Sequence, residues 1–160
     1  MSIGVGLMYT FTPASDHSRW IGYQALAGVG IGLGMQQPLI AVQTVLDISL
    51  VPIGTSVIIF VQTLGGALFV SVGQNIFTNK LSQGLKLYAP GIDPKIVLST
   101  GATSIQQTID KADLPGVTLA YNDALTQTFL VAAIMASLSI VGSLTIEWKS
   151  VKGKKIEMAA

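Results

Sequence analysis

Cysteine is absent from the 160-residue sequence, and histidine occurs once. The first absence excludes disulfide bonds, a thiol nucleophile and a cysteine-ligated metal, and the second leaves no histidine cluster for a metal site. Charged residues make up 11% of the chain, against about 25% in soluble domains. The net charge of +1 provides no basic surface for nucleic acid. Because half of the residues are hydrophobic, the composition favours a protein embedded in a bilayer.

Lys, Arg, Asp and Glu are also missing from three long stretches, residues 20–46, 48–79 and 124–146. A bilayer core of about 30 Å needs roughly 20 apolar helical residues, and each stretch is long enough. Buried helices of a soluble protein are the alternative, but they are usually shorter and carry charges along one side. We therefore predict an all-α fold, a polytopic membrane helical bundle.

Four membrane spans are predicted, and together they make residues 1–160 a membrane-domain fragment. Residues 1–11 reach only about 16 Å as a helix, and no basic residue precedes them as in a signal peptide. They are interpreted as the end of a truncated span. The expected spans are 1–11, 20–46, 53–77 and 121–148.

The segments between the spans give an expected orientation. Residues 149–160 contain a lysine cluster, which marks the cytoplasmic side in the positive-inside rule. Counting back, residues 80–120 form an extracellular loop that contains short helices, and residues 47–51 form a cytoplasmic turn. The alternative function of the cluster is binding to anionic lipid. Its members are Lys149, Lys152, Lys154 and Lys155.

One face of the 20–46 span combines small and amide side chains. Gly28, Gly32, Gln36 and Gln43 lie within an arc of about 80° at 3.6 residues per turn. Small residues let a second helix approach, and amides in hydrocarbon need partners. Pro38 removes a helical hydrogen bond, so a kink is expected beside it. The glutamines form either the polar wall of a cavity or hydrogen bonds between helices, and both interpretations stay open.

A similar stripe follows the 53–77 span. Thr55, Gln62, Gly66 and Gly73 share an arc of about 40°, and a glycine-rich stripe favours helix packing over a ligand site. The predicted packing positions of the two spans are Gly28, Gly32, Gln62, Gly66 and Gly73.

Catalytic and cofactor motifs are missing. Ser15, Asp16 and His17 are adjacent in one loop, and nothing in that spacing shapes a catalytic triad. The glycines between positions 28 and 34 lack the Lys-Ser/Thr ending and the preceding strand of a phosphate-binding loop. No enzyme activity, metal or cofactor is therefore expected.

Two segments resemble fungal multidrug and toxin efflux transporters of the major facilitator superfamily, in the fourteen-span drug:proton antiporter group. They are residues 22–38, GYQALAGVGIGLGMQQP, and residues 62–75, QTLGGALFVSVGQN. Residues 121–122 and 147–152 are similar to the carboxyl end of the same family. The motifs of the family's amino-terminal half are absent. The resemblance therefore implies the last four of fourteen spans, a part of the carboxyl-terminal half of the major-facilitator fold.

The resemblance also implies a function for a longer parent protein. That protein would lie in a lipid bilayer and export small organic compounds by proton-coupled alternating access, and the plasma membrane is favoured over the vacuole. The present chain alone is expected to be inactive. A small membrane scaffold or accessory subunit is the alternative.

In that superfamily the equivalent of the 20–46 span lines the substrate path. Gln36 and Gln43 are therefore expected to contact the substrate in the parent, with Gln24 and Gln37 as secondary candidates. Proton relays in membranes use ionisable side chains inside the spans. Since Asp47 and Asp123 lie at span boundaries, proton coupling is expected to reside elsewhere in the parent.

Overall fold

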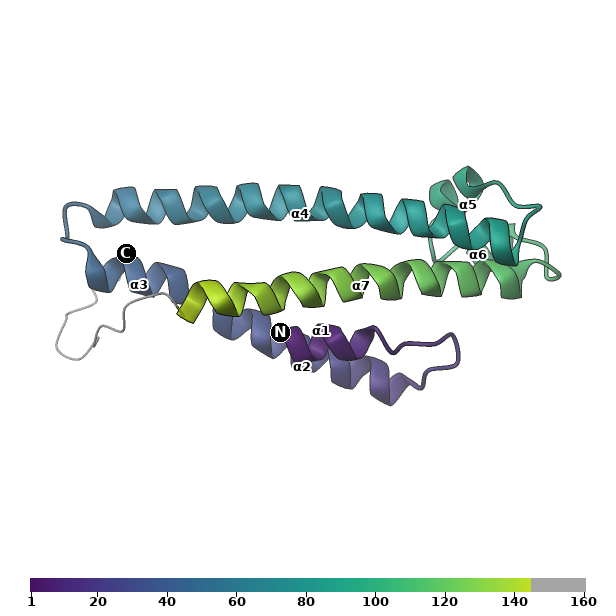
Figure 1. Ribbon diagram of the computed structural model, residues 1–160, viewed down its shortest axis with the longest axis horizontal. Helices are drawn as coiled ribbons and strands as arrows, with labels where there is room; N and C mark the ends of the chain where they lie inside the picture. Colours follow the sequence, from purple (N-terminus) through teal and green to yellow (C-terminus); the bar gives the residue numbers. More distant parts are fainter. Residues whose placement is uncertain (145–160) are drawn as a thin grey trace.

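The computed structural model describes residues 1–144, which are helical throughout apart from short connections, with no strand in that range (Figure 1). The expected end of the last span at residue 148 and the tail 149–160 lie outside the described residues. The helices are α1 (Ser2–Met8), α2 (His17–Met35), α3 (Gln37–Val45), α4 (Val51–Tyr88), α5 (Pro94–Thr100), α6 (Ile105–Thr108) and α7 (Leu114–Leu144).

Three helical segments are long and apolar enough to cross a membrane, which confirms the predicted all-α membrane fold. They are His17–Val45 with 29 residues, Val51–Tyr88 with 38 and Leu114–Leu144 with 31. At 1.5 Å per residue α4 is about 57 Å long, almost twice the thickness of a bilayer core. One end of α4 therefore extends out of the membrane.

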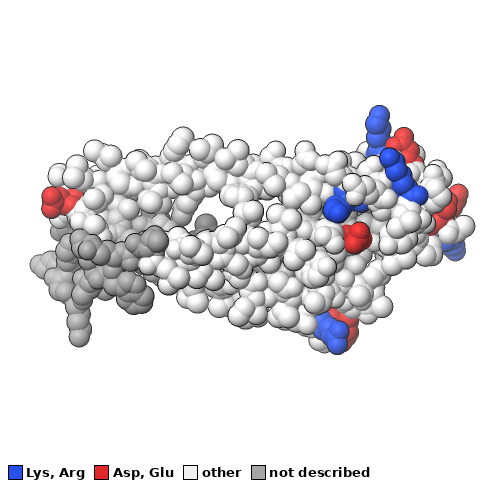
Figure 2. All heavy atoms as spheres, in the orientation of Figure 1, with Lys and Arg blue, Asp and Glu red and all other residues white. Residues whose placement is uncertain are grey.

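The long helices α4 and α7 lie side by side along the molecule (Figure 1). Helix α1 packs on both α2 and α7, and α3 packs on the first turns of α4. Charged side chains gather at the end of the molecule that carries α5 and α6, while the middle is free of them on the face shown in Figure 2. The turn that contains Asp47 lies at the opposite end, between α3 and α4.

The segment 80–120 is less of a loop than the sequence predicts. Helix α4 continues to Tyr88, beyond the expected end near residue 77, and α7 begins at Leu114, before the expected start at residue 121. The extra turns contain good helix formers such as Lys and Leu, and Pro90 is the first proline after them. Two short helices, α5 and α6, fill the remaining connection, as expected.

The largest buried cluster lies at this extended end of the bundle. Leu81, Leu85, Val97 and Val117 are almost completely buried there, and they join α4, α5 and α7. A Cβ atom added at Gly84 would lie 3.1 Å from the Cα atom of Ala120. The absence of a side chain at Gly84 therefore lets α7 approach α4 closely.

The 20–46 span is interrupted where the sequence predicts a kink. Helix α2 ends at Met35 and α3 begins at Gln37, with Gln36 between them. Pro38 lies in the first turn of α3 and has no backbone N–H to donate to the carbonyl of Gly34. The break divides the span into a longer and a shorter helix.

Candidate substrate-contacting residues

Gln36 and Gln43, the two main candidates, lie on opposite sides of the helix break. Gln36 occupies the break itself and Gln43 lies in α3. Both side chains are exposed, and neither forms a side-chain hydrogen bond with any residue in the range 1–144. Their amides are available to groups outside the described chain.

The two secondary candidates have different surroundings. The Nε2 atom of Gln37, the first residue of α3, donates a hydrogen bond across the break to the carbonyl of Leu33 in α2, 3.3 Å away. Gln24 lies about 18 Å from Gln36 along the helix axis, at 1.5 Å per residue. It borders a separate hollow beside Trp20 and Phe129. The structure therefore does not bring the four glutamines together.

The predicted packing positions have few neighbours in the described part of the chain. A Cβ atom at Gly73 would lie 3.7 Å from the Cγ2 atom of Thr128 on α7. At Gly28, Gly32 and Gly66 an added Cβ atom would meet nothing within 4 Å, and Gln62 is exposed. Packing at these four positions stays a prediction about helices outside this chain.

Close helix approaches occur instead at glycines that the sequence analysis did not select. A Cβ atom at Gly4 would meet the backbone of Ala27, and one at Gly116 would meet the carbonyl of Tyr88. Gly4 lies in a helix of 7 residues, which is too short for a helical stripe to be recognised. The glycine at position 116 follows Pro115 at the start of α7, so its sequence context is typical of a helix start rather than of packing.

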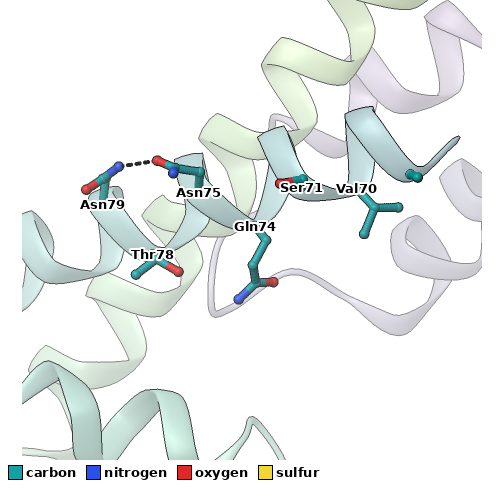
Figure 3. A pocket seen from close by; sticks show the side chains of 7 residues that line it. Val70, Ser71, Gln74, Asn75, Thr78 and Asn79 are labelled. Atoms are coloured by element: carbon teal, nitrogen blue, oxygen red, sulfur yellow. Dashed lines mark hydrogen bonds between the residues drawn. The ribbon is translucent and has the colours of Figure 1, made fainter. Parts of the chain in front are cut away.

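A polar surface along α4 is a further candidate that the sequence analysis did not assemble (Figure 3). The Nδ2 atom of Asn79 donates to the Oδ1 atom of Asn75, 2.6 Å away, and the side chain of Gln74 points outward from the helix. The signal in the sequence is the recurrence of polar residues at helical spacing. This surface borders an open groove of about 560 Å³ and is formed by Ser71, Gln74, Asn75, Thr78 and Asn79.

Ionisable groups are absent from the apolar middle of the three spans within residues 1–144. Arg19 lies in the first turn of α2, Asp47 in the turn between α3 and α4, and Asp123 in the first third of α7. No group of three or more His, Asp or Glu side chains that could hold a metal occurs in the part that the structure describes. The chemistry of the span interior is therefore that of neutral hydrogen bonding and apolar contact.

Comparison with known proteins identifies relatives over almost the whole chain. The chain is 55% identical over 159 residues to an MFS-type efflux pump of Arthroderma benhamiae, covering 99% of this chain and 30% of that protein. It is 51% identical over 157 residues to the aspyridones efflux protein of Neocamarosporium betae, covering 98% and 28%. An efflux pump of Penicillium rubens is 50% identical over 152 residues, with 95% and 28% covered.

The chain is homologous to a segment of fungal MFS-type efflux pumps. It spans about 30% of the length of the curated relatives named above. No family model matches the chain, and no solved structure matches it. The resemblance seen in residues 22–38 and 62–75 is thus confirmed at the level of the family.

In the described part of this chain, two polar surfaces interrupt otherwise apolar spans. One surrounds the break at Gln36, and the other follows α4 from Ser71 to Asn79. A polar side chain in contact with hydrocarbon is unfavourable unless it finds a partner. Both surfaces are therefore candidates for contact with water, with a bound polar compound or with polar groups of further helices.

Proposed function

We propose that residues 1–160 form the carboxyl-terminal part of a membrane transporter that exports small organic compounds. Transport would proceed by proton-coupled alternating access, in which one half of the protein moves against the other around a site near the middle of the membrane. The names of the relatives, which are efflux pumps, support this function. The chain would contribute the last spans of such a protein.

The observation that carries the proposal is the exposure of the three apolar helices. In their most apolar 18-residue parts, 6%, 0% and 11% of the residues are buried within the described chain. Lipid can cover some of this surface, but lipid offers no partner for the polar groups at Gln36, Gln43 and Gln74. These faces are suited to packing against further helices of a larger protein, so the chain alone is expected to be inactive.

The break in the 20–46 span supports a substrate-contacting role for Gln36 and Gln43. Discontinuous helices form the substrate sites of many transporters, because irregular backbone at membrane depth is tolerated only inside protein or beside water. An amide can donate to and accept from a polar compound without carrying a charge into the membrane. Gln24 and Gln37 remain secondary candidates, and Gln37 already donates a hydrogen bond to Leu33 of α2.

Proton coupling and membrane location complete the proposal. Asp47 and Asp123 lie outside the apolar middle of the spans, so the proton-carrying group is expected in another part of the complete protein. The protein is integral to a membrane, as its three apolar helices indicate. Export of organic compounds from the cell favours the plasma membrane over the vacuole.

The test is an efflux assay in yeast that lacks its own drug pumps. The complete protein is expected to reduce accumulation of a panel of organic compounds, whereas residues 1–160 alone are not. In the complete protein, Gln36→Leu and Gln43→Leu are each expected to raise the half-saturating concentration of at least one exported compound. The expected increase is about five-fold, the effect of one lost hydrogen bond. Efflux rates against concentration provide the measurement.

Ser56→Ala is the matched control for the glutamine variants, because its hydroxyl donates to the carbonyl of Pro52 within α4 and is already satisfied. It is expected to leave half-saturation unchanged. Efflux by residues 1–160 alone would overturn the proposal that further helices are required. Unchanged kinetics in both glutamine variants would leave helix packing as the role of these side chains.

A further inference from the structure

A hollow of about 380 Å³ lies between the connection of α1 to α2, the start of α2 and the middle of α7, in the half of the molecule nearer α5 and α6. It is formed by three chain segments, unlike the groove along α4, which is lined by one helix. The segments are far apart in the sequence, and they combine aromatic rings with polar side chains. The lining includes Phe11, His17, Trp20, Gln24, Asn122 and Phe129.

Aromatic contacts hold the walls of this hollow in place. The ring of Phe11 stacks on Tyr23 of α2 with centroids 5.7 Å apart and planes at 17°. The same ring meets Phe129 of α7 edge-on, at 6.5 Å and 80°. Both arrangements are favourable for aromatic quadrupoles, so Phe11 joins α2 to α7 beside the hollow.

A hydrogen bond over a long sequence separation fixes the same corner. The Nδ2 atom of Asn122 donates to the backbone carbonyl of Phe11, 3.0 Å away. This bond positions the Asn122 side chain and leaves its Oδ1 atom without a hydrogen bond among residues 1–144. The site therefore has a fixed acceptor on its α7 side.

Two further side chains offer unused recognition groups on the α2 side. The amide of Gln24 makes no side-chain hydrogen bond within the described residues, and it can both donate and accept. Trp20 is 51% exposed among the described residues, so the part of the chain that the structure describes does not cover it. Ligand pockets typically have volumes of about 300–1,000 Å³ and combine aromatic walls with a few polar groups, which is the composition found here.

We propose that this hollow binds a planar aromatic compound that carries hydrogen-bonding groups. Aromatic rings of the compound would pack against Trp20 and Phe129, and its polar groups would bond to Gln24 and Asn122. A delocalised cation would gain additional attraction from the negative faces of the indole and phenyl rings. The site is distinct from the glutamines at the helix break, because Gln24 and Gln36 are separated by about 18 Å of helix. Binding here does not depend on transport activity.

Photocrosslinking tests the site directly, with rhodamine 6G as the probe. The complete protein that contains these residues is prepared in lipid nanodiscs with Trp20 or, as a control, Ile21 replaced by p-benzoylphenylalanine. Ile21 is 60% exposed at almost the same depth but does not line the hollow. In-gel dye fluorescence after irradiation is expected to be at least about five-fold stronger at position 20. Comparable labelling at both positions would show only partition of the dye into lipid and would overturn the proposal.

A second measurement separates specific recognition of the dye from its non-specific binding. Gln24→Leu, combined with the photoreactive group at position 20, is expected to raise the half-saturating dye concentration about five-fold, the effect of losing one hydrogen bond. Gln83→Leu is the matched control, since Gln83 is an exposed amide of α4 that does not line the hollow. Unchanged half-saturation in Gln24→Leu, or lipid adducts without dye adducts at position 20, would overturn the assignment.

Discussion

Leu81 and Leu85, near the end of α4, are 0% and 1% exposed, whereas Leu64 and Leu68, earlier in the same helix, are 48% and 58% exposed. The four residues are identical in type and lie in one continuous helix. The difference comes from their surroundings, since α5, α6 and the first turns of α7 cover the end of α4. The apolar middle is left to lipid and to helices that this chain does not supply.

This comparison separates two kinds of stability in one molecule. The end that contains Leu81 and Leu85 has a core built from its own chain, as in a small soluble domain. Of the charged residues in the range 1–144, most lie at this end (Figure 2). The middle of the long helices has exposed apolar surface, which is unfavourable in contact with water. The stability of this region therefore depends on the bilayer. Experiments that act on one region and not the other can therefore test the division.

The largest contrast expected is in accessibility from the two sides of the membrane. Cysteines are placed at Ser99 in α5 and at Ser49 in the turn before α4, both exposed and at opposite ends of the bundle. In the complete protein without other accessible cysteines, Ser99→Cys is expected to react with an impermeant maleimide on intact cells. Ser49→Cys is expected to react only after permeabilisation.

This expectation follows from the predicted orientation, in which the segment 80–120 is extracellular and the turn at 47–51 is cytoplasmic. The segment 80–120 and the turn at 47–51 contain backbone groups that no helix satisfies, so they cannot lie in hydrocarbon. Each must therefore lie on one side of the membrane. The opposite labelling pattern would reverse the orientation. Labelling of both cysteines on intact cells would contradict the assignment of the two ends to different sides.

The second contrast concerns the energy of the two leucine environments. Leu85→Ala removes a buried side chain from the cluster of α4, α5 and α7 and is expected to reduce the free energy of unfolding by about 2–5 kcal/mol. Leu68→Ala, in the exposed middle, is expected to change it by less than about 1 kcal/mol in the 160-residue chain. Both can be measured by pulse proteolysis of that chain in mixed micelles over a range of denaturing detergent.

A matched leucine in the same helix controls for helix propensity, because Leu→Ala has the same intrinsic effect at both positions. Equal destabilisation by the two substitutions would mean that the middle of α4 is packed as tightly as its end. The absence of any effect at Leu85 would show that the buried cluster does not form in the isolated chain.

Much of the fold can be predicted from the sequence, because hydrocarbon imposes a strong requirement for long uncharged helices. The uncharged stretches located three spans, and Pro38 located the break at Gln36. Helix ends were predicted less well, since α4 and α7 continue past the ends of the uncharged stretches. Charged residues mark the limit of the bilayer and not the limit of a helix, so Lys80 and Lys86 fall inside α4.

The candidate sites were less predictable for a different physical reason. The polar surface of α4 follows one helix, so its spacing is visible in the sequence once Ser71 and Thr78 are considered together. The hollow at Phe11 is formed by segments separated by 111 positions at its hydrogen bond to Asn122. Spacing within a helix carries no information about such a contact. Only the packing of α1 between α2 and α7 brings those residues together.

The smallest contrast expected is local, at the first turn of α5. The carboxylate of Asp93 accepts a hydrogen bond from the backbone N–H of Lys95 at 2.9 Å and caps this helix, whose Val97 is completely buried. Asp93→Ala removes the cap, at an expected cost of about 1 kcal/mol. Amide hydrogens of α5 should then exchange about five-fold faster, which hydrogen-exchange mass spectrometry can measure. Asp93→Asn keeps an accepting oxygen and is expected to have a smaller effect. Asp110→Ala removes an equal charge without a cap, so equal acceleration in that variant would assign the effect to charge and contradict capping.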